Sequence, residues 1–533
     1  MHLHEALARG LRDIDVEVMF GLLGDANLFL ADSFVRSAGG RWVALTHEAA
    51  AVEAAVGYWQ TSGRLGVATV THGPALTNAV TALVEAVRSG AELLLIAGDT
   101  AVVDEDNLQN VAQREVVAVT GAGFQQLRSA ETWAVDLASA VRRVHAERRP
   151  VVLNVPADLM WTTASHGSSH VTVARQAVRP AAAALEAAAG LVASARRPVV
   201  LAGRGAADDH GRAALVRLAA RLGAPLMTTL RAKGLFAGEP HDLGVLGTLS
   251  HSVALDAAGR SDCVLAFGAS LNRWTTLDGS LLRTSRVVQV DTDPARIGRW
   301  VQPDAAVVGD AAAVADALVA LLDELTAEPT GFAAEVRAAP ATAEDEPPQE
   351  VLDLRTALRH LERLLPRPRT VVFDGGRFVV SAFSLLSSTD ARGFVHTVSF
   401  GSIGLGLGTA IGAAVGAPHR PTILVAGDGG FMMSGLAELT SAVRLGLDLV
   451  VVVLNDGAYG AEHVQLVRRG LDPEISTFDW PDLGPVAEAL GVEGHTVRDL
   501  DALDRALACV EKRTRPLLID IRLDAAHESA ATP

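Results

Sequence analysis

Cysteine and lysine are, together with tyrosine, the residues that this chain has least of, and the scarcity of the first two excludes several chemistries. Its 533 residues include two cysteines, Cys263 and Cys509, each within an apolar or helical stretch. We therefore expect two buried thiols, and neither a disulfide framework nor a zinc site is supported. The two lysines, Lys233 and Lys512, leave only those positions for catalysis through a lysine Schiff base.

An excess of positive charge and long apolar runs are also absent. The formal net charge is −16, and an acidic surface argues against nucleic acid or an anionic membrane as a general partner. Charged residues or helix breakers interrupt every apolar stretch before it reaches the roughly 18 residues of a membrane span. The N-terminal residues also lack a basic segment followed by an apolar core, which a signal peptide would have. We expect a cytoplasmic protein with no membrane span and no signal peptide.

What the chain does contain is a repeated alternation of short apolar runs with alanine-rich helical stretches. Hydrophobic residues make up 49% of it, and its length favours about three domains. Alternating strands and helices predict an α/β fold with a doubly wound parallel sheet in each domain. We place the domains at residues 1–165, 181–325 and 351–527, with a proline-rich, acidic linker at 326–350.

Two apolar runs around one helical crossover form the most informative pattern. The stretch 422–455 reads TILVAGDGGFMMSGLAELTSAVRLGLDLVVVVLN, and its two apolar runs lead into Asp428 and Asn455. Parallel strands end at the same edge of a sheet, so these two oxygen-bearing side chains should lie side by side. A turn after one buried strand explains a single Asp-Gly without any ligand. Two such strand ends across one crossover favour a site for Mg²⁺ and a diphosphate.

This pattern resembles the signature of thiamine-diphosphate enzymes of the 2-oxo-acid decarboxylase and acetolactate synthase group. The resemblance covers nearly the whole chain and implies a pyrimidine-binding, a middle and a diphosphate-binding domain. It implies that Asp428, Asn455 and the carbonyl group of Gly457 hold Mg²⁺, which bridges to the diphosphate of the cofactor. The further residues that it assigns to cofactor binding are Gly376, Arg377, Phe378, Ser402, Ile403, Gly427, Gly429, Gly430, Ala458 and Tyr459.

A second site is predicted where Glu48 opens an alanine-rich helix. By itself, an acid in a first helical turn is explained by the helix dipole. In the family that this chain resembles, the glutamate of the His-Glu-Ala-Ala sequence is catalytic and contacts the pyrimidine ring of the cofactor. The resemblance assigns both roles to Glu48. It also implies that Glu48 of one subunit meets the diphosphate site of another, in a homodimer or homotetramer with active sites at the dimer interface.

Glycines at every fourth position, Gly404, Gly408, Gly412 and Gly416, mark one face of a predicted helix. This spacing predicts close backbone packing against the sheet or against a partner subunit. The resemblance implies that Ile403, which precedes the helix, wedges between the two rings of the cofactor and holds them in a bent conformation.

The substrate side is predicted from two loops. Residues 70–78, VTHGPALTN, resemble the family's loop beside the thiazolium ring, and we expect His72 there to hydrogen-bond the substrate or to relay a proton. Residues 107–114 resemble a substrate-channel segment, with Gln113 as the polar contact. Two departures from acetolactate synthases, Gly121 and Ser270, argue against strict identity with them. Whether the middle domain binds FAD stays open.

The resemblance implies an enzyme that needs thiamine diphosphate and Mg²⁺ and that decarboxylates a 2-oxo acid. Ligation of the resulting enamine to a second carbonyl compound would make it a carboligase of the acetolactate synthase type, which the pattern as a whole favours. Protonation of the enamine would make it a simple decarboxylase of the benzoylformate decarboxylase type. The third hypothesis is a catalytically silent subunit, against which Glu48, Asp428 and Asn455 argue.

Overall fold

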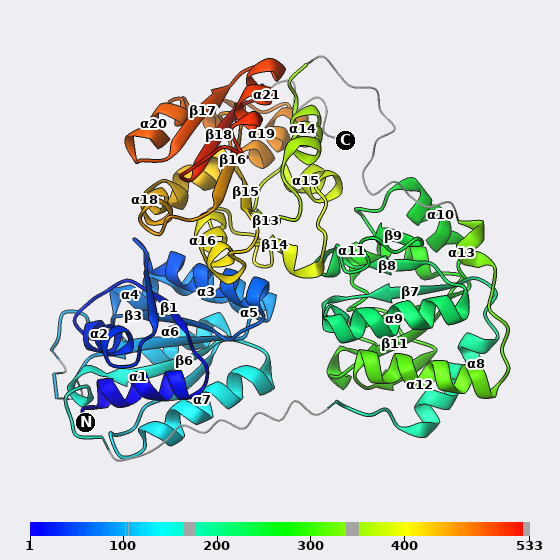
Figure 1. The fold of residues 1–533 in the computed structure, drawn as a ribbon, viewed down its shortest axis with the longest axis horizontal. Helices are drawn as coiled ribbons and strands as arrows, with labels where there is room; N and C mark the ends of the chain where they lie inside the picture. The colour runs from blue at the N-terminus through cyan, green and yellow to red at the C-terminus, as the bar shows by residue number, and fades with distance from the viewer. Residues whose placement is uncertain (102, 105, 165–176, 337–350, 526–533) are drawn as a thin grey trace. The chain divides into compact units, whose positions relative to one another are not determined.

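The structure, a computed structural model, describes residues 1–101, 103–104, 106–164, 177–336 and 351–525. Within these residues the chain forms three six-stranded parallel sheets flanked by helices (Figure 1). The predicted α/β class, with three doubly wound parallel sheets, is confirmed.

The N-terminal sheet has the spatial strand order β2-β1-β3-β4-β6-β5. Its strands are β1 Val18–Gly21, β2 Arg41–Ala44, β3 Gly66–Val70, β4 Leu93–Asp99, β5 Gly123–Gln126 and β6 Val151–Pro156. Its helices are α1 Leu3–Asp13, α2 Leu28–Arg36, α3 Glu48–Ser62, α4 Pro74–Asn78, α5 Val80–Ser89, α6 Gln113–Thr120 and α7 Trp133–Glu147. Strand β3 is buried at every residue, because helices cover both faces of a parallel sheet.

The middle sheet has the order β12-β11-β10-β7-β8-β9. Its strands are β7 Pro198–Ala202, β8 Leu226–Thr228, β9 Asp242–Val245, β10 Cys263–Phe267, β11 Arg286–Asp291 and β12 Ala305–Val308. Its helices are α8 Ala182–Ala193, α9 Asp209–Leu222, α10 Ser252–Arg260, α11 Arg273–Thr276, α12 Ala311–Glu324 and α13 Phe332–Glu335. Helix α13 lies inside the range predicted as a linker, and Phe332 is buried there; residues 337–350 of that range lie outside the described residues.

The C-terminal sheet has the order β14-β13-β15-β16-β18-β17. Its strands are β13 Thr370–Phe373, β14 Phe394–His396, β15 Thr422–Gly427, β16 Leu449–Asn455, β17 Glu493–Val497 and β18 Leu517–Arg522. The helices of this part are α14 Leu354–Leu364, α15 Val379–Leu385, α16 Gly406–Gly416, α17 Asp428–Gly430, α18 Leu436–Arg444, α19 Gly460–Arg468, α20 Leu483–Ala489 and α21 Leu500–Ala508.

The first and third sheets share one topology. Numbered from its own first strand, each has the order 2-1-3-4-6-5, whereas the middle sheet has the order 3-2-1-4-5-6. Ligands of open α/β sheets bind outside the carboxyl ends of the strands, where the strand order reverses. In the C-terminal sheet this point lies between β13 and β15.

The chain divides into two compact units, one holding the N-terminal and C-terminal sheets and the other holding the middle sheet together with Val380–Phe394. In the first unit, one hydrophobic cluster runs through both sheets, and α3 packs against α16 (Figure 1). The close packing predicted from the glycine spacing is present, but the neighbour is α3 of the same chain. A Cβ on Gly412 would lie 1.8 Å from the carbonyl oxygen of Ala54. Gly404 lies before the helix, which begins at Gly406.

The two cysteines differ in environment. Cys263 is buried in β10, as predicted, and burial raises the pKa of its thiol to about 12. Cys509 follows α21 and is only half-buried, so the expectation of a second buried thiol is wrong. Both thiols are free.

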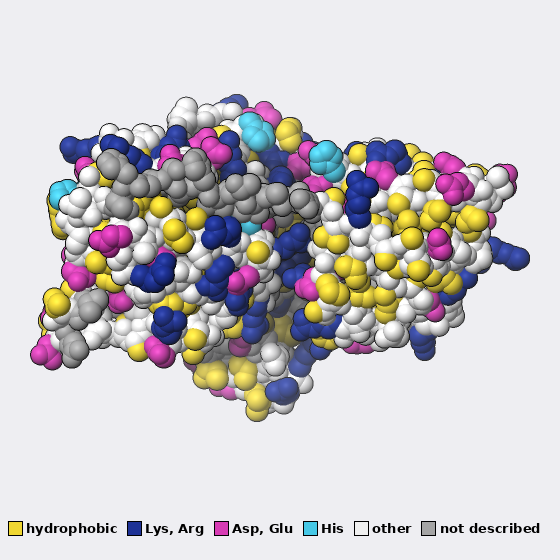
Figure 2. Space-filling view, turned by 90° about the horizontal axis from the view of Figure 1, so that it is seen from below, with side chains coloured by type: hydrophobic (Ala, Val, Ile, Leu, Met, Phe, Trp, Pro, Cys, Tyr) yellow, Lys and Arg dark blue, Asp and Glu magenta, His cyan; other side chains and the backbone are white. Residues whose placement is uncertain are grey.

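The outer surface carries charges of both signs. Figure 2 shows Lys and Arg side chains and Asp and Glu side chains distributed over the same face. Within the described residues, no helix is both long enough and apolar enough to cross a membrane.

Candidate active site

Three neighbouring strands of the C-terminal sheet end at the same edge, and the turns after them carry most of the predicted cofactor residues. Strands β13, β15 and β16 pair in parallel, and Gly427 at the end of β15 lies opposite Leu454 of β16. Because of this register, Asp428 and Asn455 leave the sheet at adjacent positions. Their predicted juxtaposition is therefore a direct consequence of strand pairing.

Asp428 is buried, and one of its two carboxylate oxygens is unpaired. The residue is 2% exposed, and its Oδ2 atom has no hydrogen-bond partner among the described residues. Burial, and then the negative charge of Asp456, raise the pKa of Asp428 to about 7, although hydrogen bonds from nearby N–H groups lower it. A bound cation would favour the ionised carboxylate, so this orphaned oxygen fits a metal ligand.

Asn455 presents its amide oxygen to the turn that follows β16. Its Nδ2 atom donates to Oδ1 of Asp520 at 2.8 Å, and its Oδ1 atom accepts from the backbone N–H of Gly457 at 3.2 Å. The Gly457 carbonyl accepts from the N–H of Phe478 at 2.7 Å, which leaves its second lone pair for another partner. Carboxylate, amide and carbonyl oxygens are the ligands that Mg²⁺ prefers, so the donor set of Asp428, Asn455 and Gly457 fits this ion.

A helical run begins directly at the end of β15. Helix α17 starts at Asp428, continues through a π-helical segment, Phe431–Gly435, and joins α18. The first N–H groups of a helix have no partner within it, and they attract anions. This run therefore places N–H groups that could bind an anion beside Asp428, Asn455 and Gly457.

The turn after β13 contributes a charged pair and a bulky ring. Arg377 donates through Nη2 to Oδ2 of Asp456 at 2.8 Å, and both side chains are largely buried. Gly376 has φ +152°, and a Cβ there would lie 2.7 Å from the ring of Phe378. The ion pair joins the turn after β13 to the turn after β16.

Aromatic rings pack against the glycines of the neighbouring turns. A Cβ on Gly427 would lie 3.4 Å from the ring of Phe378, and one on Gly429 would lie 2.7 Å from the ring of Tyr459. Ala458, just before Tyr459, is buried. A side chain at Gly429 would therefore displace the ring of Tyr459, which packs against this turn.

Asp374, at the end of β13, holds the loop that precedes α16. Its Oδ2 atom accepts from the N–H of Gly404 at 2.9 Å, and its Oδ1 atom accepts from the N–H of Leu405 at 3.2 Å. Burial raises the pKa of Asp374 to about 6, although these hydrogen bonds lower it. The carboxylate thereby positions the loop in which Ser402 and Ile403 lie.

Ile403 lies close to the glycine turns. A Cβ on Gly375 would be 3.2 Å from Cγ2 of Ile403, and a Cβ on Gly430 would be 3.4 Å from its Cβ. The side chain is half-buried, as is that of Ser402. The structure therefore brings Ile403 together with the turns after β13 and β15.

Glu48 is the first residue of α3. The helix is capped by His47, whose Nδ1 atom accepts from the N–H of Ala49 at 3.1 Å. The half-buried Glu48 carboxylate accepts from Nδ2 of Asn78 at 3.0 Å. One carboxylate oxygen is thus oriented by a neutral amide.

The segment before Glu48 is tied to the C-terminal sheet of the same unit. Oε1 of Glu438, in α18, accepts from the N–H of Thr46 at 2.8 Å, from Oγ1 of Thr46 at 2.7 Å and from the N–H of His47 at 3.1 Å. Because α18 continues the helical run that starts at Asp428, the two predicted sites are linked through one buried carboxylate.

His72 pairs with an acid that the sequence analysis did not identify. The His72 ring is 3% exposed, with Nδ1 3.1 Å from Oγ1 of Thr100 and Nε2 3.4 Å from Oδ2 of Asp25. Burial opposes ionisation of Asp25, but hydrogen bonds from Thr71 and His72 outweigh it and lower the pKa. Asp25 is mostly exposed, so its carboxylate connects the buried His72 ring to solvent.

Gln113 is buried and uses its side chain within the protein. Its Oε1 atom accepts from the N–H of Gly73 at 2.9 Å, and its Nε2 atom donates to the Gly98 carbonyl at 2.8 Å and to Oδ1 of Asn154 at 2.6 Å. Contact with a substrate, as predicted for Gln113, would require these bonds to break. In this structure the residue supports the loop that carries His72.

Several acids around the site, among them Asp25, Asp374 and Asp520, were not identified from the sequence. Asp25 and Asp374 each follow a strand in a Gly-Asp or Asp-Gly sequence, so their position at a strand end was a usable signal. Asp520 lies inside β18, and no local pattern distinguishes it from other strand residues. Only its pairing with Asn455 reveals its role.

Comparison with known proteins finds matches along most of the chain. The chain matches three family models in order: the thiamine pyrophosphate enzyme N-terminal TPP binding domain over residues 1–121, the central domain over 185–318 and the C-terminal TPP binding domain over 374–521. All three sheets of the fold are thereby represented.

Its curated relatives span almost the whole chain. The Probable 2-ketoarginine decarboxylase AruI of Pseudomonas aeruginosa is 30% identical, over 97% of this chain and 93% of that protein. The acetolactate synthase large subunit of Parasynechococcus marenigrum is 29% identical, over 97% of this chain and 87% of that protein. The sulfoacetaldehyde acetyltransferase of Castellaniella defragrans is 29% identical, over 92% of this chain and 87% of that protein. From its N-terminal sheet to its C-terminal sheet, the chain belongs to the thiamine pyrophosphate enzyme family.

Proposed function

We propose that this protein is an Mg²⁺-dependent thiamine-diphosphate enzyme that decarboxylates a 2-oxo acid. The observation that carries the proposal is the orphaned Oδ2 atom of buried Asp428, beside Asn455 and at the start of a helical run. Asp428, Asn455 and Gly457 would hold the cation, and the N–H groups at the start of α17 would bind the diphosphate. When bound, thiamine diphosphate supplies the electron sink that lets CO₂ leave.

Two other residues would act on the cofactor without binding its diphosphate. Glu48, oriented by Asn78, would hold a proton at the pyrimidine ring. Ile403, kept in place through the bonds of Asp374 to the loop, would support the bent arrangement of the rings. We further propose a homodimer or a dimer of dimers in which Glu48 of one subunit serves the cofactor site of its partner.

The pair formed by His72 and Asp25 supports protonation as the last step. An imidazole whose one nitrogen faces a hydroxyl group and whose other nitrogen faces a carboxylate can hold and pass on a proton. If His72 faces the reacting carbon, as the resemblance implies, it can deliver this proton. The product would be an aldehyde, as in a simple decarboxylase, and the 2-ketoarginine decarboxylase among the relatives agrees with this outcome.

Ligation to a second carbonyl compound is the other candidate. It is supported by the acetolactate synthases among the relatives, and it corresponds to the carboligase favoured by the sequence pattern. Both candidates share the loss of CO₂ and differ only in whether a proton or a carbonyl compound completes the reaction.

Product analysis separates the two candidates. The purified protein, with Mg²⁺ and thiamine diphosphate, would be incubated with pyruvate, phenylglyoxylate and 2-ketoarginine, each alone and with an acceptor aldehyde. We expect CO₂ and the matching aldehyde, and ligated product alone would instead establish the carboligase.

The His72→Asn variant tests the proton donor. We expect turnover to aldehyde to fall at least about 100-fold, because that is the usual contribution of a positioned acid or base. The ratio of ligated product to aldehyde should rise, since ligation does not need this proton. Unchanged turnover and an unchanged product ratio would overturn the role of His72.

A further inference from the structure

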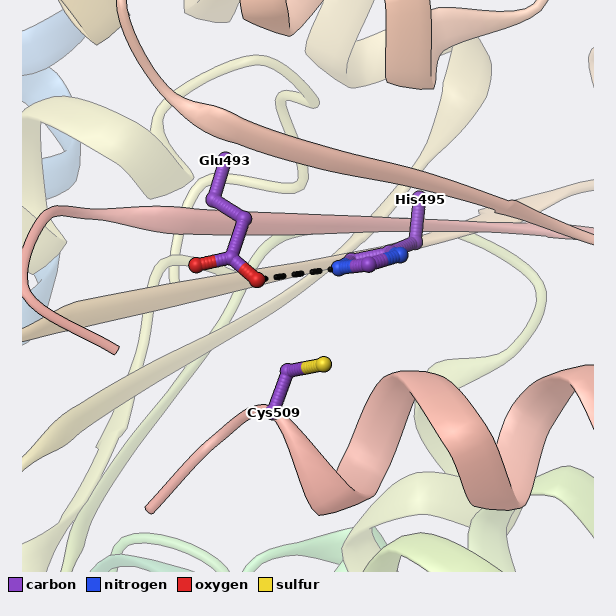
Figure 3. Close-up of side chains that lie close together, drawn as sticks. All are labelled: Glu493, His495 and Cys509. Atoms are coloured by element: carbon purple, nitrogen blue, oxygen red, sulfur yellow. Dashed lines mark hydrogen bonds and ion pairs between the residues drawn. The ribbon is translucent and has the colours of Figure 1, made fainter. Parts of the chain in front are cut away.

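Strand β17 is one of the two edge strands of the C-terminal sheet, and three chemically different side chains converge beside it. Glu493 and His495 are two residues apart on β17, so they point to the same face. Cys509 follows α21, which comes directly after β17 in the chain and packs on it. Figure 3 shows the carboxylate, the imidazole and the thiol pointing toward one another.

The three groups have the spacing of a metal site. One oxygen of Glu493, one ring nitrogen of His495 and the sulfur of Cys509 all lie within 4.8 Å of one another. The distance from Oε1 of Glu493 to Nε2 of His495 is 3.1 Å. In a tetrahedral zinc site, metal–ligand bonds of about 2.0–2.3 Å place neighbouring ligand atoms about 3.3–3.8 Å apart. Small side-chain rotations would therefore complete this geometry.

We propose that Glu493, His495 and Cys509 bind a thiophilic divalent cation of the zinc class, with water as the fourth ligand. A thiolate and an imidazole select zinc over Mg²⁺ and Ca²⁺, which prefer oxygen ligands. The side chains of His495 and Glu493 are 34% and 25% exposed, so ion and water can enter from solvent.

The Cys509 thiol makes only a weak contact within the protein, which a cation could replace. The thiol donates to the Arg505 carbonyl at 3.5 Å, a weak bond that a metal–sulfur bond would replace.

A metal at this position would fasten α21 to the edge of the sheet. Edge strands present unpaired backbone groups and invite pairing with other chains. A cation that joins β17 to the end of α21 would keep α21 packed against this edge strand. Its expected role is structural, separate from the proposed cofactor site at the carboxyl ends of β13, β15 and β16.

Cobalt titration of the full-length protein tests the site. Saturating Mg²⁺ and thiamine diphosphate would first be added, so that Co²⁺ cannot report the proposed diphosphate site. We expect one equivalent of Co²⁺ per chain to produce a thiolate-to-cobalt charge-transfer band in the near ultraviolet, which Zn²⁺ should then displace. Absence of this band, with the protein folded by circular dichroism, would overturn the proposal.

Variants assign the band to individual residues. Cys509→Ser should abolish it, and His495→Ala should weaken Co²⁺ binding at least about tenfold, because even the loss of a group that merely orients a metal ligand has an effect of that size. Cys263→Ala, the matched control at the other cysteine, and Asp428→Asn should both keep the band. A band that persists in Cys509→Ser would overturn the proposal, whereas its presence in an inactive Asp428→Asn protein separates the zinc site from the proposed function.

Discussion

Glu53 is an acid at a position where helix packing would ordinarily require an apolar side chain. It lies on the buried face of α3 and is 5% exposed, and a Cβ on Gly408 of α16 would lie 2.4 Å from its Oε2 atom. Burial, and then the charges of Asp374, Glu438 and Glu85, raise the pKa of Glu53 well above its ordinary value. The folded protein therefore favours the neutral form of this carboxyl group.

Glu53→Gln should stabilise the folded protein at pH 8 by at least about 1 kcal/mol, because glutamine carries no charge to bury. The pKa of Glu53 is higher in the folded than in the unfolded state, so the contribution of Glu53 to stability should fall as the pH rises above about 4.5 toward the folded-state pKa. Denaturant unfolding at about pH 5 and pH 8 would measure this. Glu186→Gln, at an exposed position of α8, is the control, and an equal gain at both pH values for Glu53→Gln would contradict the prediction.

Helices α3 and α16 show how small residues organise a whole interface. A Cβ on Gly57 of α3 would lie 2.0 Å from the carbonyl oxygen of Thr409, and Gly412 of α16 approaches the carbonyl oxygen of Ala54 equally closely. Two helical backbones in such contact leave no room for side chains between them. This packing joins the two sheets of the first unit and places the start of α3, with Glu48, beside α18.

Gly412→Ala should lower the free energy of unfolding by about 3 kcal/mol, because its methyl group would meet backbone atoms that cannot move independently. Gly190→Ala in α8 is the matched control, since a Cβ there has no atom within 4 Å. This control should be neutral or stabilising by up to about 1 kcal/mol, through the higher helix propensity of alanine. Equal effects of the two substitutions, measured by denaturant unfolding, would show that the close approach is unimportant.

At the scale of the whole molecule, the proposed site needs groups from two sheets of the same topology. Asp428 and Asn455 come from the C-terminal sheet, and Glu48 comes from a helix of the N-terminal sheet. Two like sheets that each supply half of a site are suited to a two-fold assembly, in which each half meets the complementary half of a partner.

Subunit mixing tests that arrangement. Glu48→Gln and Asp428→Asn proteins should each be nearly inactive, but a mixed dimer would contain one site with both native residues. After unfolding and refolding together, an equal mixture should recover about a quarter of native turnover, since about half of the dimers are mixed and each has one intact site. No recovery, with mixed dimers shown by mass spectrometry of differently tagged chains, would mean that the site lies within one chain.

The sequence by itself determined the α/β class and the juxtaposition of Asp428 and Asn455. Both follow from local patterns, because buried parallel strands read as apolar runs and parallel pairing aligns their carboxyl ends. The glycine repeat likewise indicated a close helix contact, although it did not identify α3 as the neighbour.

Only the tertiary structure decided which distant side chains meet. It paired His72 with Asp25, used the side chain of Gln113 for hydrogen bonds within the protein, and brought Cys509 close to His495. The presence of only two cysteines argued against a zinc site of the common cysteine-rich kind. A site that combines a carboxylate, an imidazole and a thiol, such as the proposed one, has no fixed ligand spacing along the chain. Such contacts depend on how elements pack, and packing is set by the summed burial of many residues rather than by a local pattern.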